Sequence, residues 1–319
     1  MILVTGASGF VGRHLVAHLL GQGLTVRCLV PPGRDVARLT HAGLPLPELA
    51  GGHLLDEESL YRAVTGVHVI FHLASAQWWG RTRDLQRYEV AGVRNLVRAA
   101  RAARVGRIIT LSHLGAAREA AWPLLQVKGV VESTLRQSGL AWTIVRSAMA
   151  FGEDDSFINA MLLSLRANPL FFAMPGQGEV VLQPIHVDDL VQALTACLER
   201  IALVDHLLEI GGPEYISLRD LLRTLMRLWH MPRLLVSVPP WLLRRMAVLY
   251  SRVFPRVMMT PQMLDLLAIS RVTGLGNAWT NFGVRPRRLE DSLVQWPRKH
   301  GWRQLAETSL RPHPRGIPG

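Results

Sequence analysis

The sequence contains little that could support a disulfide framework, a metal site or a membrane span. Its two cysteines, Cys28 and Cys197, lie far apart among apolar residues, which predicts small buried side chains rather than a disulfide or metal ligands. No apolar run approaches the roughly 18–20 residues needed to cross a bilayer. No signal peptide precedes the strand expected at Met1, so we expect a cytoplasmic protein.

Lysine is almost absent, whereas arginine is abundant. The chain has two lysines, Lys128 and Lys299, and 34 arginines, and its net charge is +12. Residues 1–199 carry a net charge of +2 and residues 200–319 a net charge of +10, so the basic excess lies in the C-terminal part. The absence of an aromatic–basic platform and of a helix-turn-helix argues against nucleic acid as a partner. An anionic membrane surface, an acidic protein partner and a solubilising arginine-rich surface remain as explanations.

A glycine-rich segment, TGASGFVG (5–12), follows the first apolar run of the chain. Gly6, Gly9 and Gly12 lead into the apolar pattern of a helix at 10–21. In such strand–turn–helix units the glycines allow a tight turn, a close approach of the backbone to a pyrophosphate, and close packing of helix on strand. The segment therefore predicts a dinucleotide site.

Predicted strands and helices alternate through the first half of the chain. The clearest are strands at 24–30, 67–75, 106–112 and 141–147 and helices at 84–104 and 123–138. Continuous Val, Ile and Leu runs separated by helices indicate a parallel sheet covered on both faces. The expected fold class is α/β, a doubly wound parallel sheet of the Rossmann type with a smaller C-terminal lobe for substrate or docking.

The pattern loosens after about residue 150. We expect a dinucleotide-binding domain at 1–150, to which 180–200 contributes, and a smaller lobe with amphipathic helices at 151–295. The Pro- and Gly-rich tail at 296–319 is expected to be disordered.

The segment 239–260 is the clearest candidate for a docking element. Its apolar residues fall at helical spacing on one face: Trp241, Leu242, Met246, Leu249 and Val253. The remaining face carries Arg244, Arg245 and Arg252. A basic amphipathic helix of this kind suits an anionic membrane surface or a partner subunit, and equally suits a helix that closes the substrate lobe.

Several motifs, in this order, resemble the short-chain dehydrogenase/reductase superfamily in its extended and atypical branches. They are TGASGFVG, GGHLLDEESL (51–60), IFHLAS (70–75), Asn95, LSHLGA (111–116), Lys128, VRSAMAFG (145–152) and QPIHVDDL (183–190). The strongest similarity is to the NmrA-like and complex I NAD(P)H-binding accessory-subunit-like group, with likeness to the NAD-dependent epimerase/dehydratase group. The resemblance covers roughly residues 1–295.

The resemblance implies which residues contact the cofactor. Those around the pyrophosphate are Gly6, Ser8, Gly9, Phe10, Val11 and Gly12. His53 and Leu54 would lie at the adenine. Contacts to the adjoining ribose and the nicotinamide would come from Leu73, Ala74, Ser75, Ser112, Lys128, Arg146, Ser147 and Ala148. Asp188 and Asp189 are interpreted as first-turn helix residues rather than catalytic acids.

The end of the strand at 24–30 favours NADP over NAD. NAD-specific folds place an acidic residue there to bind the ribose hydroxyls. Here the stretch LVPPGR (29–34) contains no acid before Asp35. The missing acid and the nearby Arg34 therefore predict NADP, with NAD as the alternative.

The usual catalytic pair of the superfamily is incomplete. Active members place a Tyr four residues before the Lys, so that the ammonium lowers the pKa of the phenol that exchanges a proton with substrate. Leu124 stands four residues before Lys128, and none of the four tyrosines has a lysine four residues later. The candidate catalytic residues that remain are Lys128, which is expected to hold the ribose, and the pair Ser112-His113.

Three functions remain open on the sequence. The first is an NAD(P)H-binding accessory or sensor protein, or a weakly active oxidoreductase. The second is an NADP-dependent reductase or a sugar-nucleotide epimerase/dehydratase-type enzyme that uses another acid, with His113 or His186 as candidates. The third is a membrane-peripheral factor of quinone or respiratory metabolism at the inner face of the membrane. No metal site is predicted, and the sequence does not define a small-molecule substrate.

Overall fold

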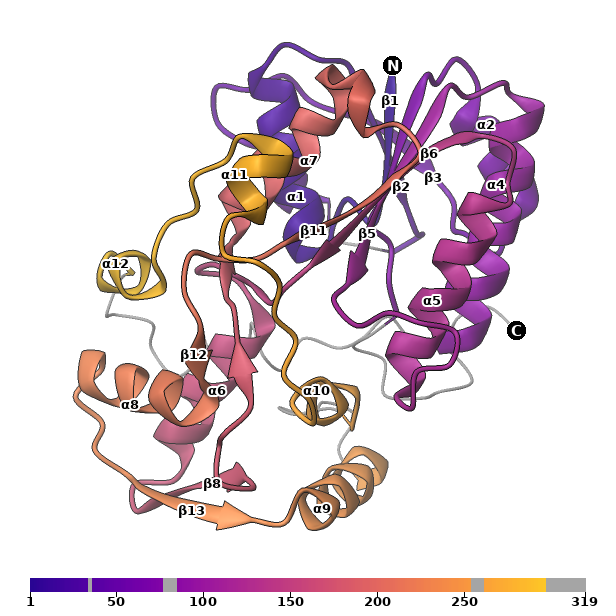
Figure 1. Cartoon of the computed structure of the whole chain (residues 1–319). Coiled ribbons are helices and arrows are strands. Elements are labelled where there is room, and N and C mark those ends of the chain that lie inside the picture. Colours follow the sequence, from indigo (N-terminus) through magenta and orange to yellow (C-terminus); the bar gives the residue numbers. More distant parts are fainter. Residues whose placement is uncertain (34–35, 77–84, 254–260, 297–319) are drawn as a thin grey trace.

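The computed structural model describes residues 1–33, 36–76, 85–253 and 261–296 (Figure 1). Seven parallel strands form the central sheet in the order β11-β6-β5-β4-β1-β2-β3. Their bounds are β1 Ile2–Thr5, β2 Val26–Val30, β3 Glu48–Gly51, β4 Val69–His72, β5 Arg107–His113, β6 Ala141–Ser147 and β11 His206–Ile210. The predicted doubly wound sheet is confirmed. Its order reverses between β1 and β4, which is where such sheets bind ligands.

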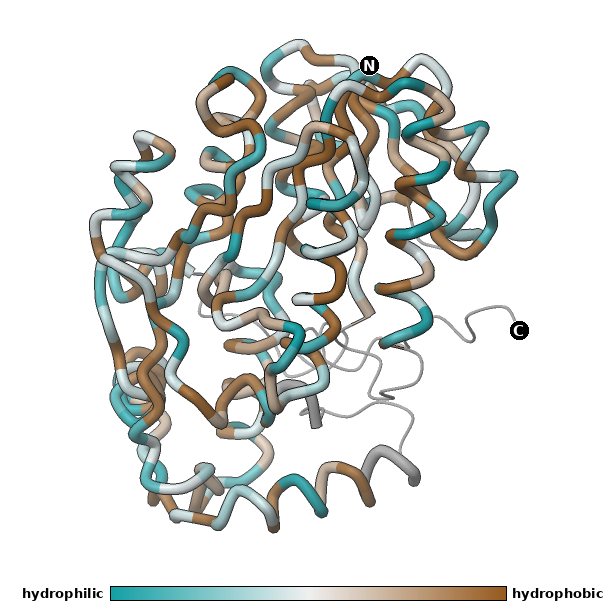
Figure 2. The backbone as a smooth tube through the Cα atoms, turned by 45° about the vertical axis from the view of Figure 1, so that its right-hand side comes forward, coloured by the Kyte–Doolittle hydropathy of each residue, from teal (hydrophilic) through white to brown (hydrophobic). Residues whose placement is uncertain are grey.

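Helices cover both faces of this sheet (Figure 1). One face carries α1 Phe10–Gly21, α7 Val187–Glu199 and α11 Asn277–Phe282, and the other α2 Glu57–Val64, α4 Gly92–Ala102 and α5 Pro123–Arg136. Successive strand residues point to opposite faces, so Val4 packs with α1 and α7 whereas Leu3 packs with α2 and α4. Because both faces are buried, the strands read as continuous apolar runs, which Figure 2 shows in brown.

The remaining elements form a smaller lobe, towards which the strands of the sheet run (Figure 1). They are β7 Ala150–Phe151, α6 Ser156–Ala167, β8 Phe171–Pro175, β9 Val181–Leu182, β10 Ile185–His186, β12 Ile216–Ser217, α8 Leu218–Leu228, β13 Leu234–Val238, α9 Pro240–Val253, α10 Pro261–Leu266 and α12 Leu289–Val294. An apolar cluster centred on α6 and α8 holds the lobe together. Helix α6 and the parallel pair β8–β13 were not predicted.

Short helical turns complete the chain at Ala37–Leu39, Arg87–Ala91 and Ile201–Leu203, the second of them a π-helical turn. Most of the tail predicted to be disordered lies outside the described residues, and the predicted domain limits stay predictions. Among the described helices, none combines the length and the apolar character that a bilayer-spanning segment requires.

Candidate functional site

The glycine-rich loop lies at the C-terminal end of β1, beside the point where the strand order reverses. Gly6 has φ +75°, and a Cβ there would lie 2.5 Å from the backbone nitrogen of Ala74. A Cβ on Gly12 would lie 2.1 Å from the Gly6 carbonyl oxygen, so the fold itself requires both glycines. Gly9 differs, because it is exposed and its Cβ would approach only the Gly6 oxygen, at 3.1 Å.

Gly9 is the N-cap residue of α1, and no side chain caps this helix end. The first backbone N–H groups of a helix have no partner within the helix, and the helix dipole favours negative charge there. With no side chain on Gly9, an anionic group can reach these N–H groups closely. The half-buried Ser8, Phe10 and Val11 flank the same point. The structure thus builds the geometry that a pyrophosphate needs.

The segments after β3 and β4 form the two flanks of this loop. After β3, Leu54 is buried beneath α4, and a Cβ on Gly92 of that helix would lie 2.8 Å from the Leu54 Cβ. Asn95 Nδ2 donates to the Leu54 carbonyl at 3.2 Å. His53 is half-buried, and its Nδ1 accepts from the Leu55 N–H at 3.2 Å. After β4, Leu73 and Ala74 run directly beside Gly6.

Lys128, on α5, is bound by an acid that the sequence analysis did not identify. Its Nζ lies 2.8 Å from Glu89 Oε2, and the two side chains are 6% and 0% exposed. Glu89 Oε1 accepts from Ser75 Oγ at 2.5 Å and from the Ala76 N–H at 2.9 Å. The π-helical turn Arg87–Ala91 carries Glu89 to this position, and such turns occur often at functional sites. The ammonium expected at the ribose is therefore paired within the protein.

Leu124, at the position of the usual tyrosine, is fully buried. It belongs to the apolar cluster that α2, α4 and α5 form against the sheet. The side chain has no polar atom, and its surroundings are those of a core residue.

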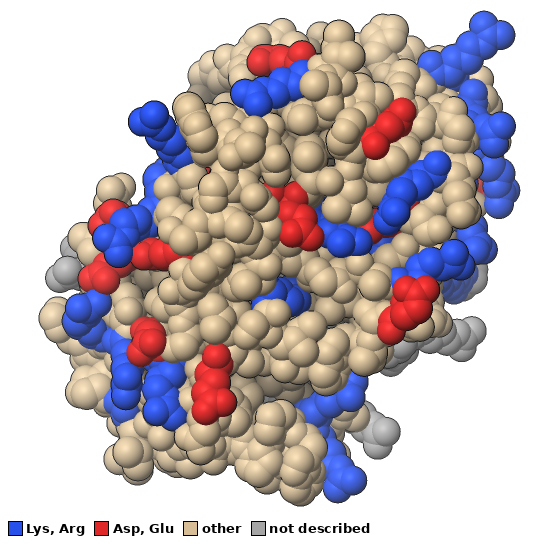
Figure 3. Space-filling model, viewed as in Figure 1, with Lys and Arg blue, Asp and Glu red and all other residues tan. Residues whose placement is uncertain are grey.

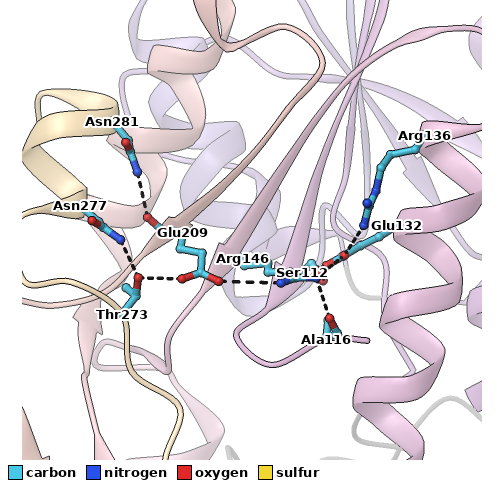
Figure 4. Close-up of polar contacts among 9 residues, drawn as sticks. All are labelled: Ser112, Ala116, Glu132, Arg136, Arg146, Glu209, Thr273, Asn277 and Asn281. Carbon is cyan, nitrogen blue, oxygen red and sulfur yellow. Dashed lines mark hydrogen bonds and ion pairs between the residues drawn. The ribbon is translucent and has the colours of Figure 1, made fainter. Parts of the chain in front are cut away.

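Ser112 and Arg146 meet at a second buried acid, Glu132 of α5 (Figure 4). Ser112 Oγ donates to Glu132 Oε1 at 2.7 Å, and Arg146 donates through Nε and Nη2 at 2.9 and 2.7 Å. Arg146 also donates to the Ala116 carbonyl at 2.6 Å. These bonds tie β5, β6 and α5 together, so both side chains have structural partners; contact of either with a nicotinamide stays a prediction.

Ser147 and Ala148 end β6. Ser147 is buried and its Oγ donates to the Ala148 carbonyl at 2.8 Å, while the Ala148 N–H donates to the Ile210 carbonyl at the same distance. Arg34, predicted to favour NADP, lies outside the described residues.

Three histidines near the site, His72, His113 and His186, have lowered pKa values. Burial, followed by the positive charges of Lys128 and Arg271, lowers the pKa of His113 well below its usual value. Burial likewise lowers the pKa of His72 to about 4, and its Nδ1 lies 2.8 Å from Thr5 Oγ1. Burial also lowers the pKa of His186, whose ring caps α7 by accepting from the Asp188 N–H at 3.3 Å.

Asp188 and Asp189 lie in the first turn of α7, as predicted. The buried Asp189 accepts from the Arg287 N–H at 2.8 Å and from its Nε at 3.0 Å. Asp188 lies 3.1 Å from His14 Nδ1. Both carboxylates therefore join the helix to neighbouring segments.

A model of NAD(P)H-binding proteins matches residues 6–161. The sterol demethylase protein B of Methylococcus capsulatus is 30% identical over 285 residues, which cover 80% of this chain and 83% of that protein. The chain belongs to the NAD(P)H-binding family. This result agrees with the dinucleotide-binding family that the resemblance implied.

Two further relatives of this NAD(P)H-binding protein have names that describe assembly or a subunit. The mouse mitochondrial NADH dehydrogenase [ubiquinone] 1 alpha subcomplex subunit 9 is 27% identical over 93% of this chain and 79% of its own. The photosystem II assembly factor Ycf39 of Cyanophora paradoxa is 35% identical over 148 residues, 46% of this chain and 44% of the relative, so that match spans less than half of either protein.

Solved structures show the same fold. The UDP-glucose 4-epimerase of Thermotoga maritima superposes with a TM-score of 0.72 at 20% identity, covering 96% of this chain and 99% of the epimerase. The NADPH-dependent quinone oxidoreductase QOR2 of Escherichia coli superposes with a TM-score of 0.71 at 18% identity, covering 92% and 98%.

The sequence analysis missed Glu89 and Glu132, the two acids that organise the site of this NAD(P)H-binding protein. Glu89 follows Arg87 and Tyr88, and Glu132 precedes Ser133 and Thr134, so neither stands alone in an apolar stretch and the sequence gives no clear signal that they are buried. Within the described residues, no group of three or more His, Cys, Asp or Glu is arranged to hold a metal ion.

Proposed function

We propose that this chain is an NADP(H)-binding accessory or sensor protein in which the Tyr–Lys hydride-transfer machinery is absent. One observation carries the proposal: Leu124 is a fully buried core residue at the tyrosine position, beside a Lys128 that is paired with Glu89. The relatives named as a subunit and as an assembly factor support an accessory role.

The chemistry of the neighbouring groups supports the same proposal. A general acid must carry a transferable proton near the working pH. Ser112 is bonded to Glu132, and the lowered pKa of His113 leaves its imidazole neutral at pH 7. The glycine loop does not depend on these groups, so binding can persist without turnover.

NADP is the preferred cofactor in this proposal. The stretch after β2, from Pro31 to Gly33, carries no acid that would accept ribose hydroxyls or repel a 2′-phosphate. We propose a cytoplasmic location for the dinucleotide-bound protein.

The experiment that tests the proposal measures binding and turnover on the same preparation. Melting temperature is followed with NADPH and with NADH, and NADPH oxidation is followed with a panel of aldehydes, ketones and quinones. We expect a larger melting shift with NADPH than with NADH, and no oxidation above the protein-free rate. No shift with either dinucleotide would reject binding. Oxidation that disappears in His113→Ala would establish the alternative, a reductase with histidine as the acid.

We also propose that the smaller lobe docks on an anionic lipid surface. Helix α9 follows directly on β13, which pairs with β8, and these elements share the lower end of the molecule in Figure 1. Large apolar side chains are exposed on them: Leu170, Phe171, Leu234, Trp241, Met246 and Leu249. The guanidinium of Arg245 lies 5.3 Å from the centre of the Trp241 ring. Exposed Trp beside Arg on an amphipathic helix suits the headgroup region, and the positive charge selects anionic lipid.

Vesicle co-sedimentation tests this second proposal with a matched control. Trp279 of α11 is also exposed and also lies beside an arginine, Arg285, at 4.8 Å, but α11 packs on the sheet rather than at the end of the lobe. We expect phosphatidylglycerol vesicles, but not phosphatidylcholine vesicles, to retain the protein, and the double variant Trp241→Ser/Leu249→Asp to lose this binding while Trp279→Ser keeps it. Equal retention of both variants would reject the surface.

A further inference from the structure

Arg271 lies in the segment between α10 and α11, where that segment passes the C-terminal end of β5. Its aliphatic stem lies over the loop that follows β5, because a Cβ on Gly115 would be 3.9 Å from Arg271 Cδ. Its Nε donates to the Leu266 carbonyl at 3.3 Å. The guanidinium is therefore held above the loop that joins β5 to α5, on the side of the sheet where ligands bind in this fold.

Arg271 has no acidic partner among the described residues, whereas several other arginines do. Arg146 pairs with Glu132, Arg244 with Asp265 and Arg287 with Asp189. The side chain is half-buried, and its loss of hydration lowers the pKa of Arg271 to about 10. A guanidinium removed from water without a counter-charge is costly, and such groups occur where a ligand supplies the missing charge.

None of the acids that the structure describes offsets the charge of Arg271. The other cation close to His113 is Lys128, and Glu89 neutralises that ammonium. Figure 3 shows basic and acidic side chains scattered over the face seen in Figure 1, with wide uncharged areas between them. Two acids at this end of the sheet, Glu132 and Glu209, are engaged by Arg146 and by Thr273.

We infer that Arg271 binds an oxyanion, the carboxylate or phosphate of a second ligand that lies beside the dinucleotide over the end of β5. A guanidinium presents a planar set of N–H donors that matches such groups, and its Nε is already used to fix its orientation. The inference rests on the proposed function in one respect only, namely that the dinucleotide beside this oxyanion lies at the glycine-rich loop. It gives the proposed accessory or sensor protein a second ligand class to respond to.

The test uses malonate and inorganic phosphate as probes, with saturating NADPH so that the glycine loop is occupied. Melting temperature is followed at constant ionic strength, with sodium chloride as the replaced salt. We expect malonate, phosphate or both to raise the wild-type melting temperature by several degrees more than chloride. The dissociation constant of the responding anion should rise at least tenfold in Arg271→Met and less in Arg271→Lys. A response to malonate indicates a carboxylate ligand, and a response to phosphate indicates a phosphate ligand.

Arg233→Met is the matched control, because Arg233 also bonds only to carbonyl oxygens, those of Leu165, Asn168 and Pro232, but lies in the smaller lobe. It should leave the anion response unchanged. Without anions, Arg271→Met should melt at or above the wild-type temperature, whereas a structural role would lower it. An anion response equal in wild type and Arg271→Met, or none in wild type, would overturn the inference. A missing NADPH shift would instead reject the dinucleotide site, and the malonate arm without NADPH would still report on Arg271.

Discussion

The ammonium of Lys128 lies 2.8 Å from the carboxylate of Glu89, and neither group reaches solvent to any useful extent. Burial alone would raise the pKa of Glu89, but the charge and hydrogen bond of Lys128, with bonds from Ser75 and Ala76, lower it overall. The carboxylate is therefore ionised at neutral pH. Each member of the pair is the counter-charge that makes the other tolerable in the core.

Lys128→Met should destabilise the protein strongly. It leaves the Glu89 carboxylate buried without its counter-charge, which costs about 3–5 kcal/mol in such pairs. Urea unfolding at pH 7 measures the loss. The double variant Glu89→Gln/Lys128→Met should recover a large part of it, because no ion remains buried. A single variant as stable as wild type would show that the pair does not stabilise the fold.

Gly9→Asp should separate folding from cofactor binding. The exposed N-cap position accepts an aspartate, whose carboxylate can bond the free N–H groups of α1, so unfolding free energy should change by less than about 1 kcal/mol. The same carboxylate repels a pyrophosphate, so the melting shift with NADPH should disappear. Gly9→Ala serves as the size control and should keep part of the shift. A full NADPH shift in Gly9→Asp would place the cofactor elsewhere.

Leu124→Tyr should not create an active enzyme. The leucine is fully buried, so a tyrosine overpacks the core and buries its hydroxyl, at a cost of about 1–3 kcal/mol. We expect no rise in NADPH oxidation with the carbonyl panel, and a lower urea midpoint than in the volume-conserving control Leu124→Met. A clear gain of turnover would show that the phenol can reach a substrate and that a proton donor is all the site lacks.

Asp155→Asn should flatten the pH dependence of stability between about pH 4 and 7. Burial raises the pKa of Asp155 from 3.8 to about 7, although the Ile158 N–H donates to it at 2.6 Å. The folded chain thus keeps a proton that the unfolded chain releases, so wild-type stability falls as pH rises through this window. Asparagine caps α6 equally well and does not titrate.

Unfolding in urea at pH 5 and pH 8 measures this effect. Relative to Asp155→Asn, the wild type should lose about 1–3 kcal/mol between the two values. Asp220→Asn, at an exposed carboxylate, should follow the wild type. Parallel pH curves for wild type and Asp155→Asn would show that the carboxyl ionises normally.

The sheet could be predicted from the sequence because each of its strands is marked by a short stretch of neighbouring residues. A strand buried on both faces reads as a continuous Val, Ile and Leu run, and the glycines at 6 and 12 are required by contacts within a few residues or with the adjacent strand. The smaller lobe carries weaker local signals. Strands β8 and β13 are about 60 residues apart and short, so neither their existence nor their pairing follows from periodicity.

The polar interior of the site could be predicted only in part. Lys128 was identified from its rarity and its motif, but its partner Glu89 is 39 residues away and is positioned by a π-helical turn that no sequence rule anticipated. The contact of Arg146 with the nicotinamide, implied by resemblance, stays a prediction, and its bonds to Glu132 could not be predicted. Which cations are paired internally and which face a ligand is decided by long-range contacts.

The segment from Thr273 to Arg287 closes the far edge of the sheet. Thr273 Oγ1 donates to Glu209 Oε2 at 2.8 Å, Asn281 Nδ2 donates to the Glu209 carbonyl at 3.3 Å, and α11 packs on β11. During synthesis, β1 to β6 leave the ribosome well before β11 and this segment. The nascent chain therefore carries a glycine loop and six strands while the edge of β6 is still unpaired, an edge of the kind that chaperones protect and that other chains can join. A stable product should therefore form only after β11 and this segment have emerged, so a premature stop codon before β11 is expected to yield aggregate rather than a smaller dinucleotide-binding protein.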